Sequence, residues 1–310
     1  MKSIKLFELL PVGMITSFGR ARRIFTNRFS ILGWGEMPYQ IPNKGAANAI
    51  LSAYFLEAFE KKGLPTNYMG LFKNDSLAKL KSLIDPTNVM EISLLQRVLP
   101  QKKDNKYDYS IFKGIKSNFI LPFKITYPLL EVETIFEENQ RSIEWKDIAD
   151  LTRFSDEEIS NIKALTLFVN DIISKEFQEI GLDVENGTLE FGFTQNRSLV
   201  LLNSPGTFDE NKICINGFPL GLKIAQIYYY NTKWGEDVLK AKSKNVHNWK
   251  ELCKVKPPPL PDDITRLISN IYCACANEIT KRIWFKKIPP IGYLCDQAEE
   301  MINCYSSPES

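Results

Sequence analysis

Residues 16–57 place a basic strand, two glycine turns and a helix in direct succession, and this succession limits the possible fold more than any other stretch. The turn Asn43-Lys44-Gly45 leads into the largely apolar run 46–57, which predicts a helix. The stretch before it carries four arginines: Arg20, Arg22, Arg23 and Arg28. Since the first N–H groups of a helix are free and attract anions, the stretch predicts a phosphate or carboxylate pocket.

The arginines divide between the two faces of the predicted strand. Side chains alternate along a strand, so Arg20 and Arg22 share one face and Arg23 lies on the other. The face of Arg20 and Arg22 either binds phosphate, which suits arginine, or carries surface charge only, and at least one arginine is expected to be solvated. Lys44 is unfavourable at the positive end of a helix unless an anion meets it, which favours a ligand over a plain turn at Lys44-Gly45.

The charge balance argues against a nucleic-acid-binding protein. The 310 residues include 39 basic and 37 acidic side chains, a formal net charge of +2, without a long run of like charges. No run of about 18 uncharged apolar residues occurs either, so no membrane partner is expected, and the protein is predicted to be soluble and cytoplasmic. With 44% hydrophobic and 25% charged residues, the composition is that of a folded globular protein.

The cysteines and the single histidine exclude several kinds of site. The cysteines form no Cys-x-x-Cys pair, which predicts reduced, mostly buried thiols rather than a zinc site or a disulfide framework. They are Cys214, Cys253, Cys273, Cys275, Cys295 and Cys304. His247 is the only histidine, which nearly excludes a catalytic triad, a His-ligated metal or an imidazole base.

Strands dominate the first part of the chain and helices the rest, which predicts an α+β fold of two lobes with a cleft between them. The lobes are expected to be residues 1–100, mainly β with one helix, and 101–310, larger and helical at its C-terminal end. The expected elements are a strand meander over 1–35 with turns at Gly13, Gly19 and Gly33; strands at 67–72, 88–99, 107–112 and 118–137; a polar loop at 102–108; helices at 45–62, 75–84, 155–180 and 262–284; and a hairpin over 188–202 with its turn at 195–197.

Glu190 is a carboxylate within the apolar run Leu189-Glu190-Phe191-Gly192-Phe193. Alternation places it opposite the leucine and phenylalanine face. From that face, the Glu190 side chain points either into water or into the cleft. In the cleft, its carboxylate would bind the magnesium ion that accompanies a bound triphosphate.

Nine motifs, in order over nearly the whole chain, resemble those of SAICAR synthetase, a purine-pathway ligase, and especially its archaeal-type branch. They are Gly19-Arg-Ala-Arg22, Asn27-Arg-Phe-Ser30, Pro42-Asn-Lys-Gly45, Gly63-Leu-Pro-Thr66, Asp108-Tyr-Ser110, Thr134-Ile-Phe-Glu137, Leu189-Glu-Phe-Gly192, Gly206-Thr-Phe-Asp-Glu-Asn-Lys212 and Pro257-Pro-Pro-Leu-Pro261. The resemblance implies a two-lobed fold, with an antiparallel sheet in the N-terminal lobe, a mixed and helical C-terminal lobe, and an ATP cleft.

The resemblance also implies a reaction and its site. ATP and magnesium would activate a carboxylate as an acyl phosphate, which an amine attacks, so the partners are a small-molecule acid and amine. Gly19, Arg20 and Arg22 would bind the nucleotide phosphates, and Glu190 would bind magnesium. The substrate-binding residues would be Arg28, Ser30, Lys44, Gly45, Asp209 and Lys212, the last in place of an arginine that holds the ribonucleotide phosphate. It identifies no catalytic side chain, and a homo-oligomer is possible.

Most departures from the family pattern lie at its acidic positions, while Ile135 and Thr188 replace lysines. Asn203-Ser204 replaces an acidic pair, which removes an expected magnesium carboxylate and weakens metal binding. Further departures are Asn27, Gly33, Lys124, Ile135, Asn186 and Thr188, and the Arg-Asn and Gly-Ser segment that grips the ribonucleotide is deleted before Pro128.

Three hypotheses follow from the matches and departures. The leading one is an ATP-dependent carboxylate–amine ligase of this fold with an altered acid substrate. The second is a non-catalytic ligand-binding homologue with a degraded metal site. The third is an authentic SAICAR synthetase of purine biosynthesis.

Overall fold

A four-stranded antiparallel sheet forms from the N-terminal part of the chain. The computed structural model describes residues 2–9, 19–72, 87–93, 102–103, 106–107, 111–113, 128–133, 142–152, 154–194 and 196–306. The sheet has the order β1-β2-β4-β3, with β1 at Lys2–Leu9, β2 at Arg20–Ser30, β3 at Tyr68–Phe72 and β4 at Val89–Ser93. The strands predicted within residues 1–35 are therefore present as β1 and β2, Gly33 lies in a turn after β2, and the turn predicted at Gly13 lies outside the described residues.

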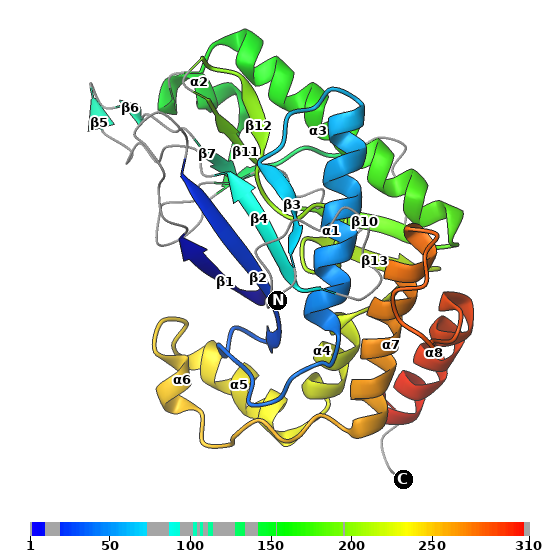
Figure 1. Ribbon diagram of the computed structural model, residues 1–310. Helices are drawn as coiled ribbons and strands as arrows, with labels where there is room; N and C mark the ends of the chain where they lie inside the picture. The colour runs from blue at the N-terminus through cyan, green and yellow to red at the C-terminus, as the bar shows by residue number, and fades with distance from the viewer. Residues whose placement is uncertain are drawn as a thin grey trace.

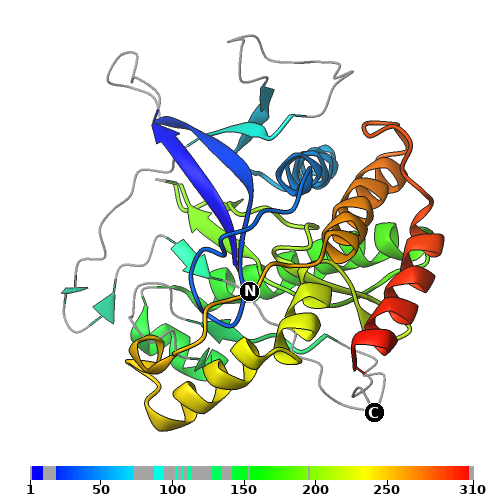
Figure 2. The ribbon, with the colours of Figure 1, turned by 90° about the horizontal axis from the view of Figure 1, so that it is seen from below.

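Helix α1, Lys44–Lys61, packs on this sheet through contacts with β2, β3 and β4. Its other side contacts α7, Asp262–Ile279, so α1 lies between the sheet and α7 (Figures 1 and 2). This position explains why α1 is apolar or small on most sides, since a helix covered on two sides has little face left for solvent. Gly63, at φ +86°, follows it in the left-handed conformation expected of the predicted stop.

Three further sheets form from later residues of the part of the chain that the structure describes. A five-stranded sheet has the order β12-β11-β7-β8-β9, and a three-stranded sheet has the order β10-β13-β14. Their strands are β7 Ile111–Lys113, β8 Val132–Glu133, β9 Ser142–Ile143, β10 Asp183–Gly187, β11 Glu190–Phe193, β12 Leu199–Leu201, β13 Asn211–Ile215 and β14 Phe218–Pro219. β11 and β12 pair antiparallel, which confirms the predicted hairpin.

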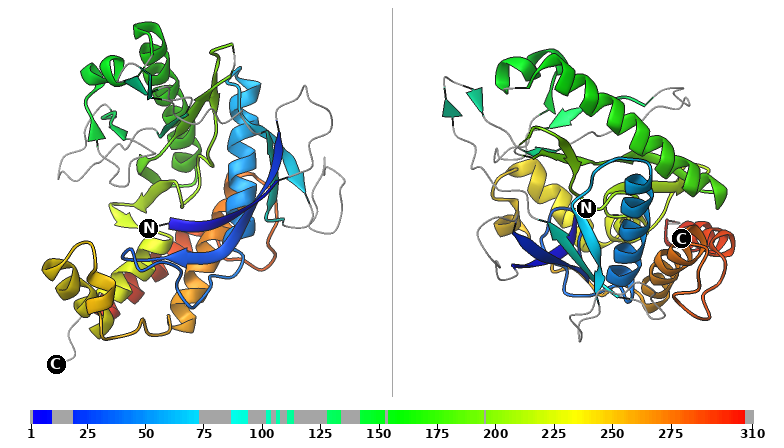
Figure 3. Two further views of the ribbon diagram at one scale, coloured as in Figure 1. Left: turned by 90° about the vertical axis from the view of Figure 1, so that its left-hand side faces the viewer. Right: turned by 45° about the horizontal axis from the view of Figure 1, so that its top comes forward.

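Helix α3, Asp156–Glu179, matches the predicted helix to within a residue at each end. Ser155 caps it: its hydroxyl accepts from Glu158 N at 3.2 Å, and the Glu158 carboxylate accepts from Ser155 N at 2.9 Å. This reciprocal pair is the capping box that the sequence Ser-Asp-Glu-Glu encodes. α3 packs on β10 and lies at the opposite end of the molecule from α5 and α6 (Figure 3).

The remaining helices cover the C-terminal part of the chain. They are η1 Trp145–Asp147, α2 Ile148–Leu151, α4 Leu222–Tyr230, α5 Lys233–Lys244, α6 Trp249–Leu252 and α8 Ile291–Ser306. In the part of the chain that the structure describes, every helix is too short or too polar to span a bilayer.

Two element predictions were wrong. The helix predicted over 262–284 ends at Ile279, because the Asn277 side chain fastens the chain that follows it: Oδ1 accepts from Trp284 N at 2.8 Å, and Nδ2 donates to Phe285 O at 2.8 Å. The loop predicted over 102–108 contains two short paired strands, β5 Lys102–Lys103 and β6 Lys106–Tyr107, whose backbone groups bond each other rather than solvent alone.

Several predicted elements cannot be compared with the structure. The helix predicted at 75–84 lies outside the described residues, as does most of the strand predicted at 118–137. The division into lobes 1–100 and 101–310 stays a prediction.

Candidate active site

The arginines of β2 lie on opposite faces, as predicted, but the buried face is that of Arg23. Arg20 is exposed, Arg22 is half-buried, and Arg23 is only 6% exposed. Ala21 and Phe25, the neighbours of Arg23 on its own face, are core residues. Arg23 is therefore an interior cation, while Arg20 and Arg22 share the more accessible face.

Arg23 is held by the segment that follows β12. Its Nη1 donates to Ser204 Oγ at 2.9 Å, and its Nη2 donates to Leu202 O at 2.8 Å. Leu202 N in turn donates to Glu190 O at 2.8 Å. The backbone of Leu202 therefore connects the guanidinium of Arg23 to β11. Burial lowers the pKa of Arg23, and the carboxylates of Glu210 and Glu190 oppose that effect.

The described residues around Glu190 add few ligands to the magnesium site predicted there. Glu190 is half-buried at the start of β11. The buried Asn203 donates from Nδ2 to Thr188 O at 2.6 Å, and its Oδ1 accepts no hydrogen bond, so it offers one neutral oxygen. Within the described residues, no three His, Cys, Asp or Glu side chains converge on a point that could hold a metal. Since magnesium binds through hard, mostly charged oxygens, these residues do not fit it.

Lys44 and Asp209 meet each other inside the protein. Their side chains are 0% and 2% exposed, and Lys44 Nζ lies 3.6 Å from Asp209 Oδ2. Asn48 Nδ2 donates to the same oxygen at 2.6 Å, and the Tyr272 hydroxyl lies 3.4 Å from Asp209 Oδ1. Burial, and then the Asp209 charge, raise the pKa of Tyr272 well above its usual value. The anion that Lys44 predicted at the start of the helix is thus an internal carboxylate.

The start of α1 is held against β2 by its backbone. Gly45 N donates to Asn27 Oδ1 at 3.0 Å, which satisfies one of the free N–H groups of the helix. A Cβ on Gly45 would lie 2.3 Å from Phe25 O, so only glycine fits between helix and strand. The glycine of the predicted anion turn therefore has a packing role.

The other predicted substrate residues lie on separate elements. Arg28 Nη1 contacts Glu36 Oε2 at 3.1 Å, and Ser30 is half-buried at the end of β2. On β13, the ammonium of Lys212 forms an ion pair with Glu185 of β10. Lys223 lies near enough that burial first, and Lys212 second, lower its pKa.

One segment, residues 202–212, connects most of these groups. Leu202 and Ser204 bind Arg23, Asp209 binds Lys44, and Lys212 binds Glu185. The segment packs against α1 at Gly206, where a Cβ would lie 2.0 Å from the Phe55 ring. The segment therefore links Arg23 of β2, Lys44 of α1 and Glu185 of β10 in one framework of contacts. It brings together three of the predicted site residues, Lys44, Asp209 and Lys212.

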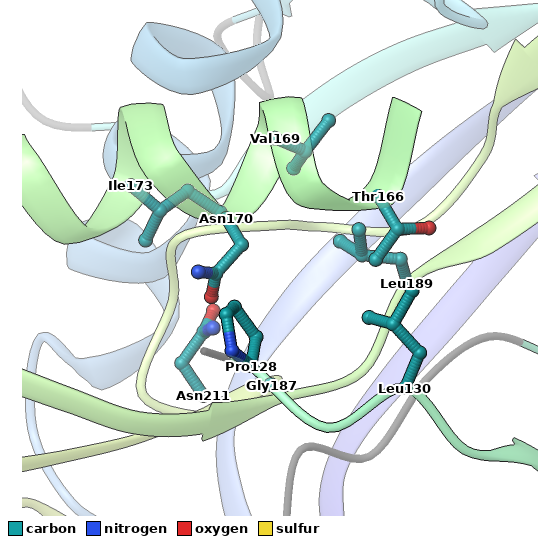
Figure 4. Close-up of a pocket in the computed structure, with 9 residues that line it drawn as sticks. All are labelled: Pro128, Leu130, Thr166, Val169, Asn170, Ile173, Gly187, Leu189 and Asn211. Atoms are coloured by element: carbon teal, nitrogen blue, oxygen red, sulfur yellow. The ribbon is translucent and has the colours of Figure 1, made fainter. Parts of the chain in front are cut away.

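A small cavity lies beside this framework, between α3, residues 128–130 and the strands β10 and β13. Its volume is about 20 Å³, enough for roughly one water molecule and far too little for a nucleotide. Among its lining residues, the amides of Asn170 and Asn211 point toward one another (Figure 4). It is not the site of a substrate.

Sequence reasoning missed Arg23, Asn48 and Tyr272 as parts of this framework. One signal was present for Arg23: Ala21, Arg23 and Phe25 alternate on one face, and two of the three are apolar. No such signal exists for Asn48 or Tyr272, because their partner Asp209 lies far away in the chain.

Three comparisons with known proteins agree on one family. The model of the SAICAR synthetase family matches residues 19–211. A protein of Archaeoglobus fulgidus, provisionally named phosphoribosylaminoimidazole-succinocarboxamide synthase, is 30% identical, with 92% of this chain and 95% of that protein covered. Among solved structures, SAICAR synthase from Saccharomyces cerevisiae complexed with SAICAR aligns with a TM-score of 0.58 at 12% identity, covering 90% of this chain and 96% of that one. A SAICAR synthetase in complex with ADP aligns at 0.52 and 18% identity, covering 84% and 98%.

Proposed function

Because the chain belongs to the SAICAR synthetase family, whose members are ATP-dependent ligases, we propose that it catalyses the family's own reaction. The γ-phosphoryl group of ATP moves to the carboxylate of carboxyaminoimidazole ribonucleotide, and ADP leaves. The amine of aspartate then attacks the acyl phosphate, so that an amide bond forms and inorganic phosphate is released.

The correspondence over the whole length of the Archaeoglobus protein carries this proposal. At 30% identity it extends over 92% of this chain, so the similarity includes both the arginine strand and the helical C-terminal part. Of the three hypotheses, the comparisons therefore favour an authentic SAICAR synthetase over an altered acid substrate.

The proposed roles follow the accessibility of the side chains. Arg20 and Arg22, with Gly19, would bind the ATP phosphates, since guanidinium groups match phosphate oxygens in pairs. Arg28, Ser30 and Lys212 would contact the substrates. Lys44, Gly45 and Asp209 are buried, and we assign them the task of holding the 202–212 segment and the start of α1 at the substrate pocket.

Chemistry of this kind depends on positioning and on charge neutralisation. It requires no imidazole base, which agrees with a chain whose only histidine, His247, is exposed. The residues around Glu190 do not fit magnesium, so no step is assigned to a protein-held metal. The cytoplasmic location and the possible homo-oligomer stay predictions.

The test is ADP release with ATP, carboxyaminoimidazole ribonucleotide and aspartate supplied together, and then with each left out. ADP that forms only when all three are present supports the proposal. If ATP binds without ADP release, the altered-acid or the non-catalytic hypothesis replaces it.

Lys212→Met gives this assay a site-directed arm. The KM for the ribonucleotide should rise by roughly tenfold or more, the effect of losing about 1.4 kcal/mol of binding. Lys175→Met is the matched control, since Lys175 also pairs with a carboxylate, Asp171 at 2.7 Å, but lies exposed on α3. An equal change in the two variants would argue against a substrate contact at Lys212.

A further inference from the structure

We infer that the guanidinium of Arg23 is a resident cation at the position beside Glu190 where a nucleotide-binding site of this family would hold a divalent ion. Nucleotide binding by this chain then does not require a metal. The part of this inference that concerns nucleotide rests on the proposed function, and the part that concerns metal does not.

The position of Arg23 is fixed by hydrogen bonds. Its two terminal nitrogens bond Ser204 Oγ and Leu202 O, which flank Asn203. Leu202 N bonds Glu190 O, so the guanidinium lies among the very residues that the family resemblance assigned to the metal. At 6% exposure, Arg23 cannot turn out to solvent without breaking these bonds.

Arg23 lies near two carboxylates, as a bound metal cation would. The carboxylates of Glu210 and Glu190 both stabilise its charged form. A second cation entering beside Glu190 would be repelled by the guanidinium, and this repulsion is weakly screened because Arg23 is buried. A magnesium ion would thus lose part of the attraction that Glu190 offers.

Among the residues that the structure describes, few groups beside Glu190 could also act as ligands to a metal. Asn203 provides one neutral oxygen, while Ser204 is held by Arg23. The Asn203-Ser204 pair carries no negative charge, and the buried guanidinium of Arg23 is positive. Both features make this position less attractive to a divalent cation than an acidic pair would be.

The first experiment measures binding directly. Isothermal titration calorimetry on the full chain would follow ATP with magnesium chloride and ATP with EDTA, and paramagnetic resonance would follow manganese alone as the metal probe. We expect the two ATP dissociation constants to agree within about threefold and manganese to bind no more tightly than about 1 mM.

Variants then connect the result to Arg23. In Arg23→Gln/Asn203→Asp, a cation is removed and a carboxylate is added, so manganese should bind at least about tenfold more tightly than to the wild type, and ATP binding should become metal-dependent. Asn203→Asp alone should show no gain, because Arg23 would pair with the new carboxylate. Arg197→Gln is the control, since it removes a half-exposed guanidinium that pairs with Glu158.

The results of these titrations distinguish the metal part of the inference from its nucleotide part. Manganese binding by the wild type that Glu190→Gln abolishes overturns the inference, as does ATP binding that EDTA eliminates. If ATP binds in neither solution, the proposed function and the nucleotide part fail together, and the manganese titration still decides the metal part. If Arg23→Gln does not fold, as judged by its melting curve, the wild-type and Glu190→Gln titrations decide.

Discussion

At the first turn of α1, the backbone of Gly45 lies directly against Phe25 O of β2. Gly45→Ala is expected to lower the free energy of unfolding by about 2 kcal/mol or more, because its Cβ would lie 2.3 Å from that oxygen and neither backbone can move easily. Urea unfolding followed by far-UV circular dichroism measures the change.

Gly292, in the first turn of α8, supplies the control for Gly45. A Cβ there would meet nothing within 4 Å. Gly292→Ala should therefore leave the free energy of unfolding unchanged or raise it by up to about 1 kcal/mol. Equal losses in both variants would show that the contact with Phe25 is not the cause.

The buried pair Lys44–Asp209 makes a second prediction at this scale. Lys44→Met is expected to lower the free energy of unfolding by about 3 kcal/mol, because it removes the cationic partner of the buried Asp209 side chain. The double variant Lys44→Met/Asp209→Asn should lose less than the sum of the single variants. Additive losses in chemical denaturation would mean that the pair does not couple.

Among the helices, α3 is fastened at its start by more than its own cap. Arg197, in the turn of the β11–β12 hairpin, bonds the Glu158 carboxylate through Nε and through Nη2 at 2.7 Å. This bond, together with the donation from Ser155 N, holds the pKa of Glu158 below its usual value of 4.5, although desolvation acts in the opposite direction. The hairpin and α3 are therefore joined through one ionised group.

The stability that this carboxylate provides should depend on pH. Its pKa is lower in the folded state, so the stabilisation is complete above about pH 4.5 and is lost as the pH falls through the folded-state pKa. Arg197→Met removes the main cause, so wild type and variant should differ in urea midpoint at pH 7 and converge as the pH falls below the folded-state pKa of Glu158. A constant difference at all pH values would contradict this account.

Elements that carry their own signals were predictable from the sequence. Ser155 and Glu158 mark the start of α3 within four residues, and the α1 stop is marked by Gly63. The end of α7 was not predictable, because Asn277 folds the chain back through side-chain bonds that no local pattern announces.

The candidate site was predictable only where the residue types and their local pattern determine how a side chain is placed. Arg20 and Arg22 were placed on one face by alternation, but Arg23 reaches Ser204 across 181 residues of sequence. Lys44 likewise predicted an anion at the start of α1. The sequence could not show whether that anion is a bound ligand or the carboxylate of Asp209. Burial of a charge depends on a partner that only the tertiary fold supplies.

On the scale of the whole molecule, a chain of aromatic rings crosses the proposed boundary between the lobes. Phe55 of α1 stacks on Phe177 of α3 at 6.0 Å between ring centroids. Phe177 meets Phe208 at 6.4 Å, and Phe208 meets Tyr272 of α7 at 4.8 Å. Because α1 shares its core with α3 and α7, residues 1–100 would expose apolar surface if they separated, and we expect one cooperative unfolding transition.

Buried thiols on different elements can report this transition. Cys214 lies on β13, Cys273 and Cys275 lie on α7, and Cys295 lies on α8, all of them buried. Burial raises the pKa of Cys214, Cys273 and Cys295 to about 12, so little thiolate is present in the folded protein. In brief pulses of iodoacetamide across a urea series, these thiols should become labelled together, at the midpoint where the ellipticity is lost.

Peptide mass spectrometry would resolve the sites one by one. Cys253, which is half-buried, serves as the internal reference, since its labelling should begin at lower urea. Labelling of the α7 thiols before the loss of ellipticity would mean that the helical part opens independently of the sheet and α1. That result would divide the molecule into the two units that its sequence suggested, whereas a common midpoint would show that α1 joins them into one.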